Sequence, residues 1–133
     1  MENFMTAWRP QLLSVFRIVS ALCILQFGTA KILKFPAVQM FEKVTPAEFP
    51  SGIAGMLELV LGALLLIGLF SRPAAFILAG LMAFAYFLGH ASGGFFPIVN
   101  DGTLAVLFCF AFLYLSAAGP GPWSVDAAVR NKP

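Results

Sequence analysis

Four long apolar stretches constrain the fold of this chain more than any other feature. They cover residues 11–33, 52–70, 73–91 and 102–118. Each is close to the length of about 17–25 residues that a helix needs to cross the hydrocarbon core of a bilayer. The sequence therefore predicts an all-α protein, an integral membrane bundle of four transmembrane helices that forms a single domain over residues 1–133.

The composition also favours a lipid environment. Only 11% of the 133 residues are charged, against about 25% in a typical soluble domain. Polar side chains are therefore too few to cover a compact fold with a surface suited to water. The net charge of +2 is too small and too dispersed for a nucleic-acid-binding surface. We expect the lipid bilayer as the main partner and exclude nucleic acid.

Short and long connections alternate between these stretches. Only Ser71 and Arg72 separate the second stretch from the third, which predicts a tight antiparallel hairpin. Pro73 suits the first turn of the helix that follows. The last long connection, residues 92–102, combines glycines with aromatic side chains, and we expect it to fold back on the helices as a structured loop.

The first connection, residues 34–51, contains an amphipathic segment. Val38, Phe41 and Val44 fall on one face of it. This spacing predicts a short interfacial helix in the first outer loop.

Lysine and arginine are distributed unequally between the two sides of this topology. One side has Arg9, Arg72, Arg130 and Lys132, and the other has Lys34 and Lys43 together with Glu42, Glu48 and Asp101. Because cytoplasmic flanks carry the excess of positive charge, both termini are predicted to be cytoplasmic.

A cleaved signal peptide is the alternative interpretation of the first stretch. Gly28-Thr29-Ala30 resembles a cleavage site of small residues. Arg17 interrupts the apolar core of that stretch, which favours a retained helix.

Ionisable side chains inside the apolar stretches need an explanation, because each costs a few kcal/mol in a bilayer. At 100° per residue, Arg17 and Lys31 share one face of the first helix. Glu58 lies between Gly55 and Gly62 on a stripe that favours close packing against another helix. We predict an ion pair between Lys31 and Glu58 inside the bundle. For Arg17, snorkelling to the cytoplasmic interface or pairing within the bundle is the structural interpretation.

The third and fourth predicted helices also have polar groups at their outer ends, at about the same depth in the membrane as Lys31 and Glu58. Tyr86 and His90 end the third helix at positions i and i+4, and Asn100 and Asp101 precede the fourth. The sequence therefore predicts a polar pocket on the outer side. The candidate pocket or buried-charge residues are Arg17, Lys31, Glu58, Tyr86, His90, Asn100 and Asp101. For each residue taken alone, a structural role is the alternative to a role with a ligand or a proton.

The two cysteines and the single histidine give no metal signature. Cys23 and Cys109 lie in apolar stretches without a C-x-x-C motif. They provide too few ligands with His90 for a haem or iron–sulfur group, so we expect no metal site. Cys109 is predicted to face the core, and both thiols are expected to pack as small buried apolar groups. A disulfide between them would need a particular rotation of the helices.

Motifs along nearly the whole chain resemble the DoxX family of small bacterial membrane proteins. They are Arg17, Gly28-Thr29-Ala30-Lys31, Gly55-Met56-Leu57-Glu58, Gly62, Gly68-Leu69-Phe70-Ser71-Arg72-Pro73-Ala74-Ala75, His90, Phe96-Pro97, Asn100, Gly102 and Gly119-Pro120-Gly121-Pro122-Trp123-Ser124-Val125-Asp126. The resemblance implies a four-helix bundle in the bacterial inner membrane. Thr103 stands where the family commonly has a glutamate after an Asn-x-Gly motif. Asp101 can replace the charge of that glutamate but not its geometry.

The resemblance also implies redox chemistry, because the family is linked to a terminal quinol oxidase, to thiosulfate-to-quinone electron transfer and to oxidative-stress complexes. Our main hypothesis is a subunit or accessory of a membrane redox system. Its outer pocket would take a quinone-like or small lipophilic ligand, and any activity would be that of an oxidoreductase component acting with partners.

Two other functions stay open. In the first, the chain is a structural or assembly subunit docked on a larger membrane complex, and its buried charges only fix the helix register. Besides lipid, the expected partner is a protein of a membrane redox complex or a second copy of this chain. A transporter ranks lower, because the sequence has no inverted repeat and no discontinuous helices.

Overall fold

The computed structural model of the chain describes residues 2–37, 39–41, 43–45, 48–49 and 51–130. Within this part the chain is helical, with no strand. Long helices occupy the four apolar stretches, namely α2 (Arg9–Gly28), α3 (Ser51–Ile67), α4 (Ser71–Gly89) and α6 (Thr103–Ala118). The predicted all-helical fold is confirmed.

Shorter helical elements flank the long helices. The helix α1 (Glu2–Ala7) precedes α2, and the π-helical turn η1 (Thr29–Leu33) extends it. In the first connection the structure describes a single 3₁₀ turn, η2 (Gln39–Phe41). Among the described residues of this connection, the predicted interfacial helix is represented by this turn, and Val38 lies outside the described residues. The elements η3 (Ala91–Gly93) and α5 (Pro97–Asn100) connect α4 to α6, and α7 (Val125–Arg130) follows them.

Two segments are long and apolar enough to cross a membrane by themselves. They are Arg9–Leu33, with 25 residues, and Ser71–Gly93, with 23 residues. The helices α3 and α6 are apolar but have only 17 and 16 residues. At 1.5 Å per residue they are about 26 and 24 Å long, slightly less than the roughly 30 Å of a bilayer core.

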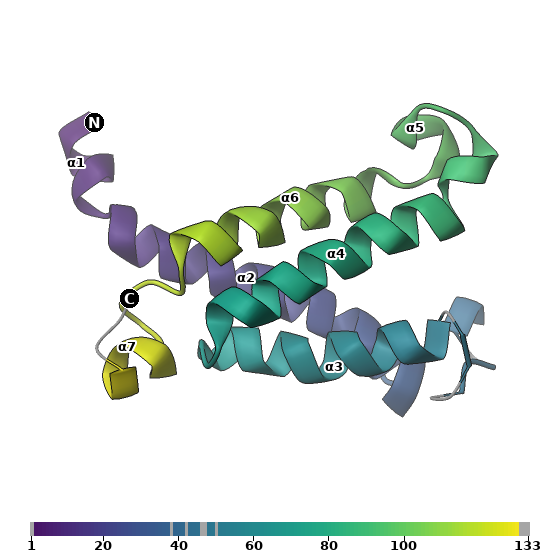
Figure 1. Cartoon of the computed structure of the whole chain (residues 1–133), viewed down its shortest axis with the longest axis horizontal. Coiled ribbons are helices and arrows are strands. Elements are labelled where there is room, and N and C mark those ends of the chain that lie inside the picture. Colours follow the sequence, from purple (N-terminus) through teal and green to yellow (C-terminus); the bar gives the residue numbers. More distant parts are fainter. Residues whose placement is uncertain (1, 38, 42, 46–47, 50, 131–133) are drawn as a thin grey trace.

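The long helices run in alternating directions and form two pairs (Figure 1). The first pair is α2 with α3, the second is α4 with α6, and contacts between α3 and α4 join the two pairs. The short helices α1 and α7 both lie at the left of Figure 1, at the end where α2 begins.

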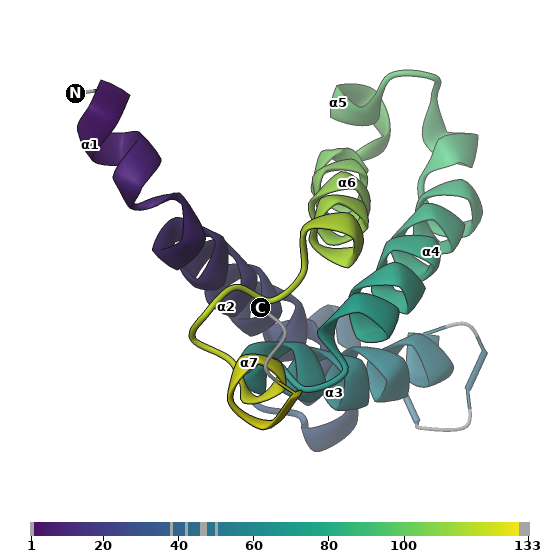
Figure 2. The same cartoon turned by 60° about the vertical axis from the view of Figure 1, so that its left-hand side comes forward.

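The helices α2 and α6 make few contacts with each other, and Figure 2 shows them separating. Two aromatic contacts bridge them. The ring centroids are 6.4 Å apart in both Phe16–Tyr114 and Phe27–Phe108. We refer to this open side of the fold as the α2–α6 seam.

The core lies where the two pairs meet, and apolar side chains also cover the outside. Core residues are Ala21, Ile24, Leu65, Ala75, Leu78, Ala79, Met82, Phe108, Phe112 and Leu115. On the outer faces of the long helices, large apolar side chains such as Val19, Val60, Phe76 and Phe110 are exposed. Exposed apolar surface on this scale is rare on soluble monomers, and it suits contact with lipid.

The turn between α3 and α4 begins three residues earlier than the sequence predicted and ends two residues earlier. It consists of residues 68–70, with positive φ angles at Gly68 (77°) and Phe70 (52°). Ser71 and Arg72 already belong to α4. The Asp126 carboxylate accepts hydrogen bonds from the backbone N–H groups of Phe70 (3.0 Å) and Ser71 (2.9 Å). A distant acidic side chain thus satisfies amide groups at the start of α4 that otherwise lack partners, which the local pattern could not indicate.

Candidate functional site

Lys31 and Glu58 form a buried ion pair at the end of the long helices opposite α1 and α7. Lys31 Nζ lies 3.0 Å from Glu58 Oε1, and the side chains are 12% and 4% exposed. The predicted pair is therefore present. Glycines make the close approach of α2 and α3 possible. A Cβ atom on Gly28 would lie 2.7 Å from the backbone nitrogen of Leu59, and one on Gly55 would lie 2.9 Å from Lys31 Cβ.

A second lysine, Lys34, holds the first connection close to this ion pair through hydrogen bonds. Lys34 Nζ donates hydrogen bonds to the carbonyl groups of Lys31 (2.9 Å), Phe41 (2.9 Å) and Val44. Lys31 Nζ accordingly lies 5.2 Å from the centroid of the Phe41 ring, within range of a cation–π contact. The sequence had indicated Lys34 only as a flanking charge, because its acceptors are backbone carbonyls.

Asn100 organises the connection between α4 and α6. Its amide nitrogen donates to Tyr86 Oη (3.0 Å) and to the Gly94 carbonyl (2.9 Å), and its Oδ1 accepts from the N–H of Gly102 (2.9 Å). Its own carbonyl lies 3.1 Å from His90 Nδ1. A carbonyl can only accept, so Nδ1 carries the hydrogen, and Nε2 of a neutral ring is left as an acceptor.

The Asn100→Ala variant is expected to lose about 2 kcal/mol of stability, because the Gly102 N–H and the Gly94 carbonyl lose their side-chain partner. Thermal unfolding in detergent measures this loss, and limited proteolysis should cut residues 91–100 faster. Thr103→Ala is the matched control, since Thr103 is exposed one residue beyond Gly102. Equal stability of the two variants would contradict the role given to Asn100.

A cavity of about 290 Å³ lies among these groups, and we call it the Glu58 cavity. Its polar wall consists of Lys31, Glu58, His90 and Asp101. The rest of the wall is apolar and comprises Ile24, Phe27, Phe41, Met82, Ala85, Leu104, Ala105 and Phe108. A second cavity of about 360 Å³, the α3–α4 cavity, shares Lys31, Ala85 and His90 with it.

Six of the seven candidate residues lie in or next to the Glu58 cavity, and the seventh, Arg17, lies apart from them. Four of them line the Glu58 cavity, and Tyr86 and Asn100 lie outside its wall, where they hold the connection. Arg17 lies near the other end of the helices. Asp101 and Thr103 are both exposed, and of the two only Asp101 lines the cavity.

Arg17 is only 1% exposed, and its hydrogen-bond partners are backbone carbonyls. The guanidinium donates to the carbonyls of Trp123 (2.8 Å), Leu66 (3.3 Å) and Pro120. Ser14, one turn earlier, donates to the Pro120 carbonyl (3.2 Å) and accepts from the N–H of Trp123 (3.1 Å). Arg17 therefore pairs within the protein, as one of the two structural interpretations predicted, and does not snorkel.

Residues 119–126 have a structural role that the sequence pattern did not predict. In the sequence they stand out only as one motif of the family resemblance, but in the structure the segment folds back against α2. Gly121 lies so close to α2 that a Cβ atom would be 2.2 Å from Ser14 Oγ, and its φ is +81°. The paired glycines and prolines, followed by Ser124 as an N-cap and by Asp126, were the available signal.

The cysteines differ from each other. Cys109 is partly buried against the core, but Cys23 is exposed on α2, which corrects the prediction that both are buried. Ala21 and Ile24 occupy the inward face at that level of α2, so the side chain between them points outward. Both thiols are free. Within the described residues, no group of three or more His, Cys, Asp or Glu side chains could hold a metal ion.

Comparison with known proteins identifies the family. The family model of DoxX matches residues 12–91, a range that includes Arg17, Lys31, Glu58 and His90. The chain belongs to the DoxX family. The resemblance seen in the sequence is thereby confirmed, and with its apolar helices this DoxX chain is a membrane protein.

A similar chain from Haemophilus influenzae has the name "Uncharacterized protein". It is 41% identical over 127 residues, which cover 93% of this DoxX chain and 95% of the relative. No solved structure matches. Asn100, Asp101 and the segment 119–126 lie beyond the matched DoxX range.

Proposed function

We propose that this DoxX protein spans the bacterial inner membrane with four helices and acts as a subunit or accessory of a membrane redox system. The Glu58 cavity carries the proposal, because it combines a buried ion pair, a histidine and aromatic rings. It would take a quinone-like or small lipophilic molecule. Any catalysis would be that of an oxidoreductase component working with a protein partner.

The alternating helix directions support the four-span topology, and the distribution of Arg9 and Arg72 supports cytoplasmic termini. Arg9 begins α2 and Arg72 lies in the first turn of α4, so both belong to the end of the molecule where α1 and α7 lie, which agrees with an excess of positive charge on cytoplasmic flanks. The short helices α3 and α6 are compatible with this placement, since a bilayer thins locally around a short span at modest cost.

The polar groups of the cavity are suited to both redox forms of a quinone. The Lys31 ammonium is a donor for a quinone carbonyl. The Glu58 carboxylate is an acceptor for a quinol hydroxyl, and so is Nε2 of His90 when Nδ1 carries the only ring hydrogen. The rings of Phe27, Phe41 and Phe108 offer flat apolar surface for the ligand ring. An apolar tail would lie in the adjoining α3–α4 cavity, whose wall includes Ile53, Leu57, Phe84 and Leu88.

Calorimetric titration of the purified protein in detergent with a short-chain benzoquinone tests this proposal. We expect saturable binding that His90→Ala and Glu58→Gln each weaken by at least about tenfold. His90→Ala removes an acceptor and Glu58→Gln replaces a charged acceptor with a neutral amide, and we expect each change to cost more than about 1.4 kcal/mol in a dry site. Glu48→Gln is the matched control. It removes an exposed carboxylate of the first connection that does not line the cavity.

A different observation supports the structural alternative. Phe95 is 87% exposed, and Phe96, Ile98 and Val99 of the same connection are exposed as well. These side chains offer an apolar surface for a larger membrane complex. If no quinone binds and the protein co-purifies in fixed stoichiometry with such a complex after gentle extraction, the assembly role replaces the ligand-binding role.

A further inference from the structure

A separate cavity lies at the end opposite the Glu58 cavity, where α2 begins. Its volume is about 710 Å³, within the range of about 300–1,000 Å³ that is typical of small-molecule sites. Its wall comprises Met5, Thr6, Arg9, Pro10, Leu12, Leu13, Phe16, Tyr114, Ala118, Gly121 and Pro122. These residues belong to α1, α2, α6 and the segment 119–126, so the cavity opens along the α2–α6 seam.

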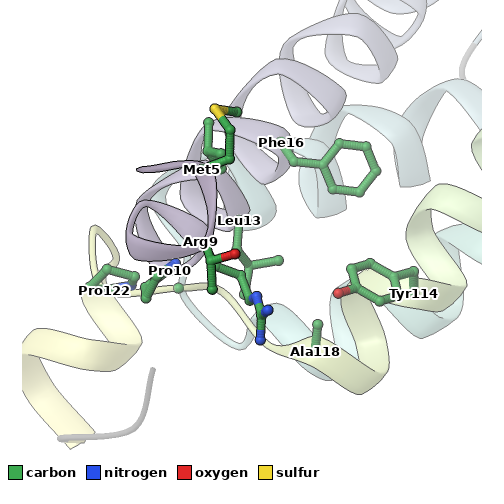
Figure 3. Close-up of a pocket in the computed structure, with 11 residues that line it drawn as sticks. Met5, Arg9, Pro10, Leu13, Phe16, Tyr114, Ala118 and Pro122 are labelled. Atoms are coloured by element: carbon green, nitrogen blue, oxygen red, sulfur yellow. The ribbon is translucent and has the colours of Figure 1, made fainter. Parts of the chain in front are cut away.

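The wall is apolar along the helices and has one cation. From Arg9 to Phe16 it follows α2 for about 10 Å, at 1.5 Å per residue. None of the lining residues is acidic. Figure 3 shows the Arg9 side chain reaching from α2 toward α6, and the Tyr114 hydroxyl pointing toward it from the other side.

Arg9 differs from the other arginines whose side chains are described at this end. Arg17 and Arg72 both donate to backbone carbonyls, Arg72 to those of Ser116 (3.3 Å) and Ala117. The Arg9 guanidinium forms no hydrogen bond or ion pair with another described residue. A positive charge without a partner at the mouth of an apolar groove matches a ligand with an anionic head and an apolar tail.

We infer that this groove binds one anionic phospholipid. Its phosphate would lie on the Arg9 guanidinium, a geometry that arginine favours, and one acyl chain would occupy the α2–α6 seam beside Leu13 and Phe16. The site is separate from the Glu58 cavity and does not depend on the redox proposal. It rests on the membrane location of the protein and on the charge and shape of the groove.

Tryptophan fluorescence can test this inference directly. The chain has two tryptophans, Trp8 next to Arg9 and Trp123 next to Pro122, so both report on this end. The full chain is reconstituted in vesicles of phosphatidylcholine with increasing brominated phosphatidylglycerol, or with brominated phosphatidylcholine. We expect quenching to indicate a preference of about fivefold for phosphatidylglycerol, the factor given by about 1 kcal/mol per basic side chain at an anionic surface.

Three variants separate the site from general attraction to the membrane surface. Arg9→Gln should bring the relative binding constant of the two lipids to about one. Arg72→Gln makes the same charge change at the same end but outside the groove, and it should keep the preference. Ala118→Phe fills the seam and should also lower the preference while Arg9 is intact.

Several outcomes would overturn the inference. The first is equal quenching by the two lipids in the wild type. The second is an equal loss of the preference for phosphatidylglycerol in Arg9→Gln and Arg72→Gln. The third is an unchanged preference for phosphatidylglycerol in Ala118→Phe.

Discussion

The Arg17→Ala variant is expected to unfold with a loss of about 3–5 kcal/mol, the size typical of breaking a buried charged network. The carbonyls of Leu66, Pro120 and Trp123 would each lose a charge-assisted donor, and hydrogen bonds to charged groups contribute about 1.5–3 kcal/mol each. Unfolding in mixed micelles, followed by circular dichroism, measures the change. We expect the segment 119–126 to detach from α2 and become sensitive to protease.

Arg9→Ala is the matched control for this experiment, because Arg9 is an exposed arginine on the same helix. It should change the stability by less than about 0.5 kcal/mol. If Arg17→Ala does not accumulate in the membrane, Ser14→Ala provides a milder test. It removes contacts to the same two residues, Pro120 and Trp123, and should cost about 1 kcal/mol. Equal stability of the variants at residues 9 and 17 would contradict the role given to Arg17.

The second large effect is expected at the ion pair. Lys31→Met leaves the Glu58 carboxylate buried without its cation, and we expect a loss of about 3–5 kcal/mol. The double variant Lys31→Met/Glu58→Gln removes both charges, and its stability should return to within about 1 kcal/mol of the wild type. The same micelle titration on all four proteins gives the coupling energy between the two side chains.

This cycle also separates a structural role of the pair from a role with a ligand. If the pair only holds α2 on α3, the double variant should keep every function that the wild type has. Under our proposal, the double variant is stable but binds benzoquinone at least about tenfold more weakly. Additive effects of the two single substitutions on stability would show that the ion pair is not coupled as the structure indicates.

The inward faces of the helices could largely be predicted, because a charged side chain within a bilayer has to pair inside the bundle or reach the interface. The inward faces of the first two long helices followed from a period of 3.6 residues, and Ser14, Arg17, Glu58 and Gly62 are buried as that period required. The ion pair followed from the same argument, since opposite charges on facing stripes lower each other's cost. The ligand-binding roles of the candidate residues stay a prediction.

Other features of the structure could not be predicted, because they involve backbone acceptors or contacts between segments far apart in the sequence. The partners of Arg17 and Lys34 are carbonyl groups, which every residue has, so no residue pattern identifies them. Asp126 determines where α4 begins across more than fifty residues of chain. The exposure of Cys23 depends on the rotation of α2 about its axis. In an apolar stretch, few polar residues indicate which face of the helix points inward.

The bonds between Arg17 and the far end of the chain have a consequence for biogenesis. Pro120 and Trp123 follow Arg17 by 103 and 106 residues, so they leave the ribosome long after α2 does. Until they arrive, Leu66 is the one acceptor of the three that the chain has already supplied, and the rest of the guanidinium has to reach toward headgroups or water from within an inserted helix. The fold therefore closes late, and a nascent chain that stops short of Pro120 and Trp123 leaves the charge of Arg17 only partly compensated.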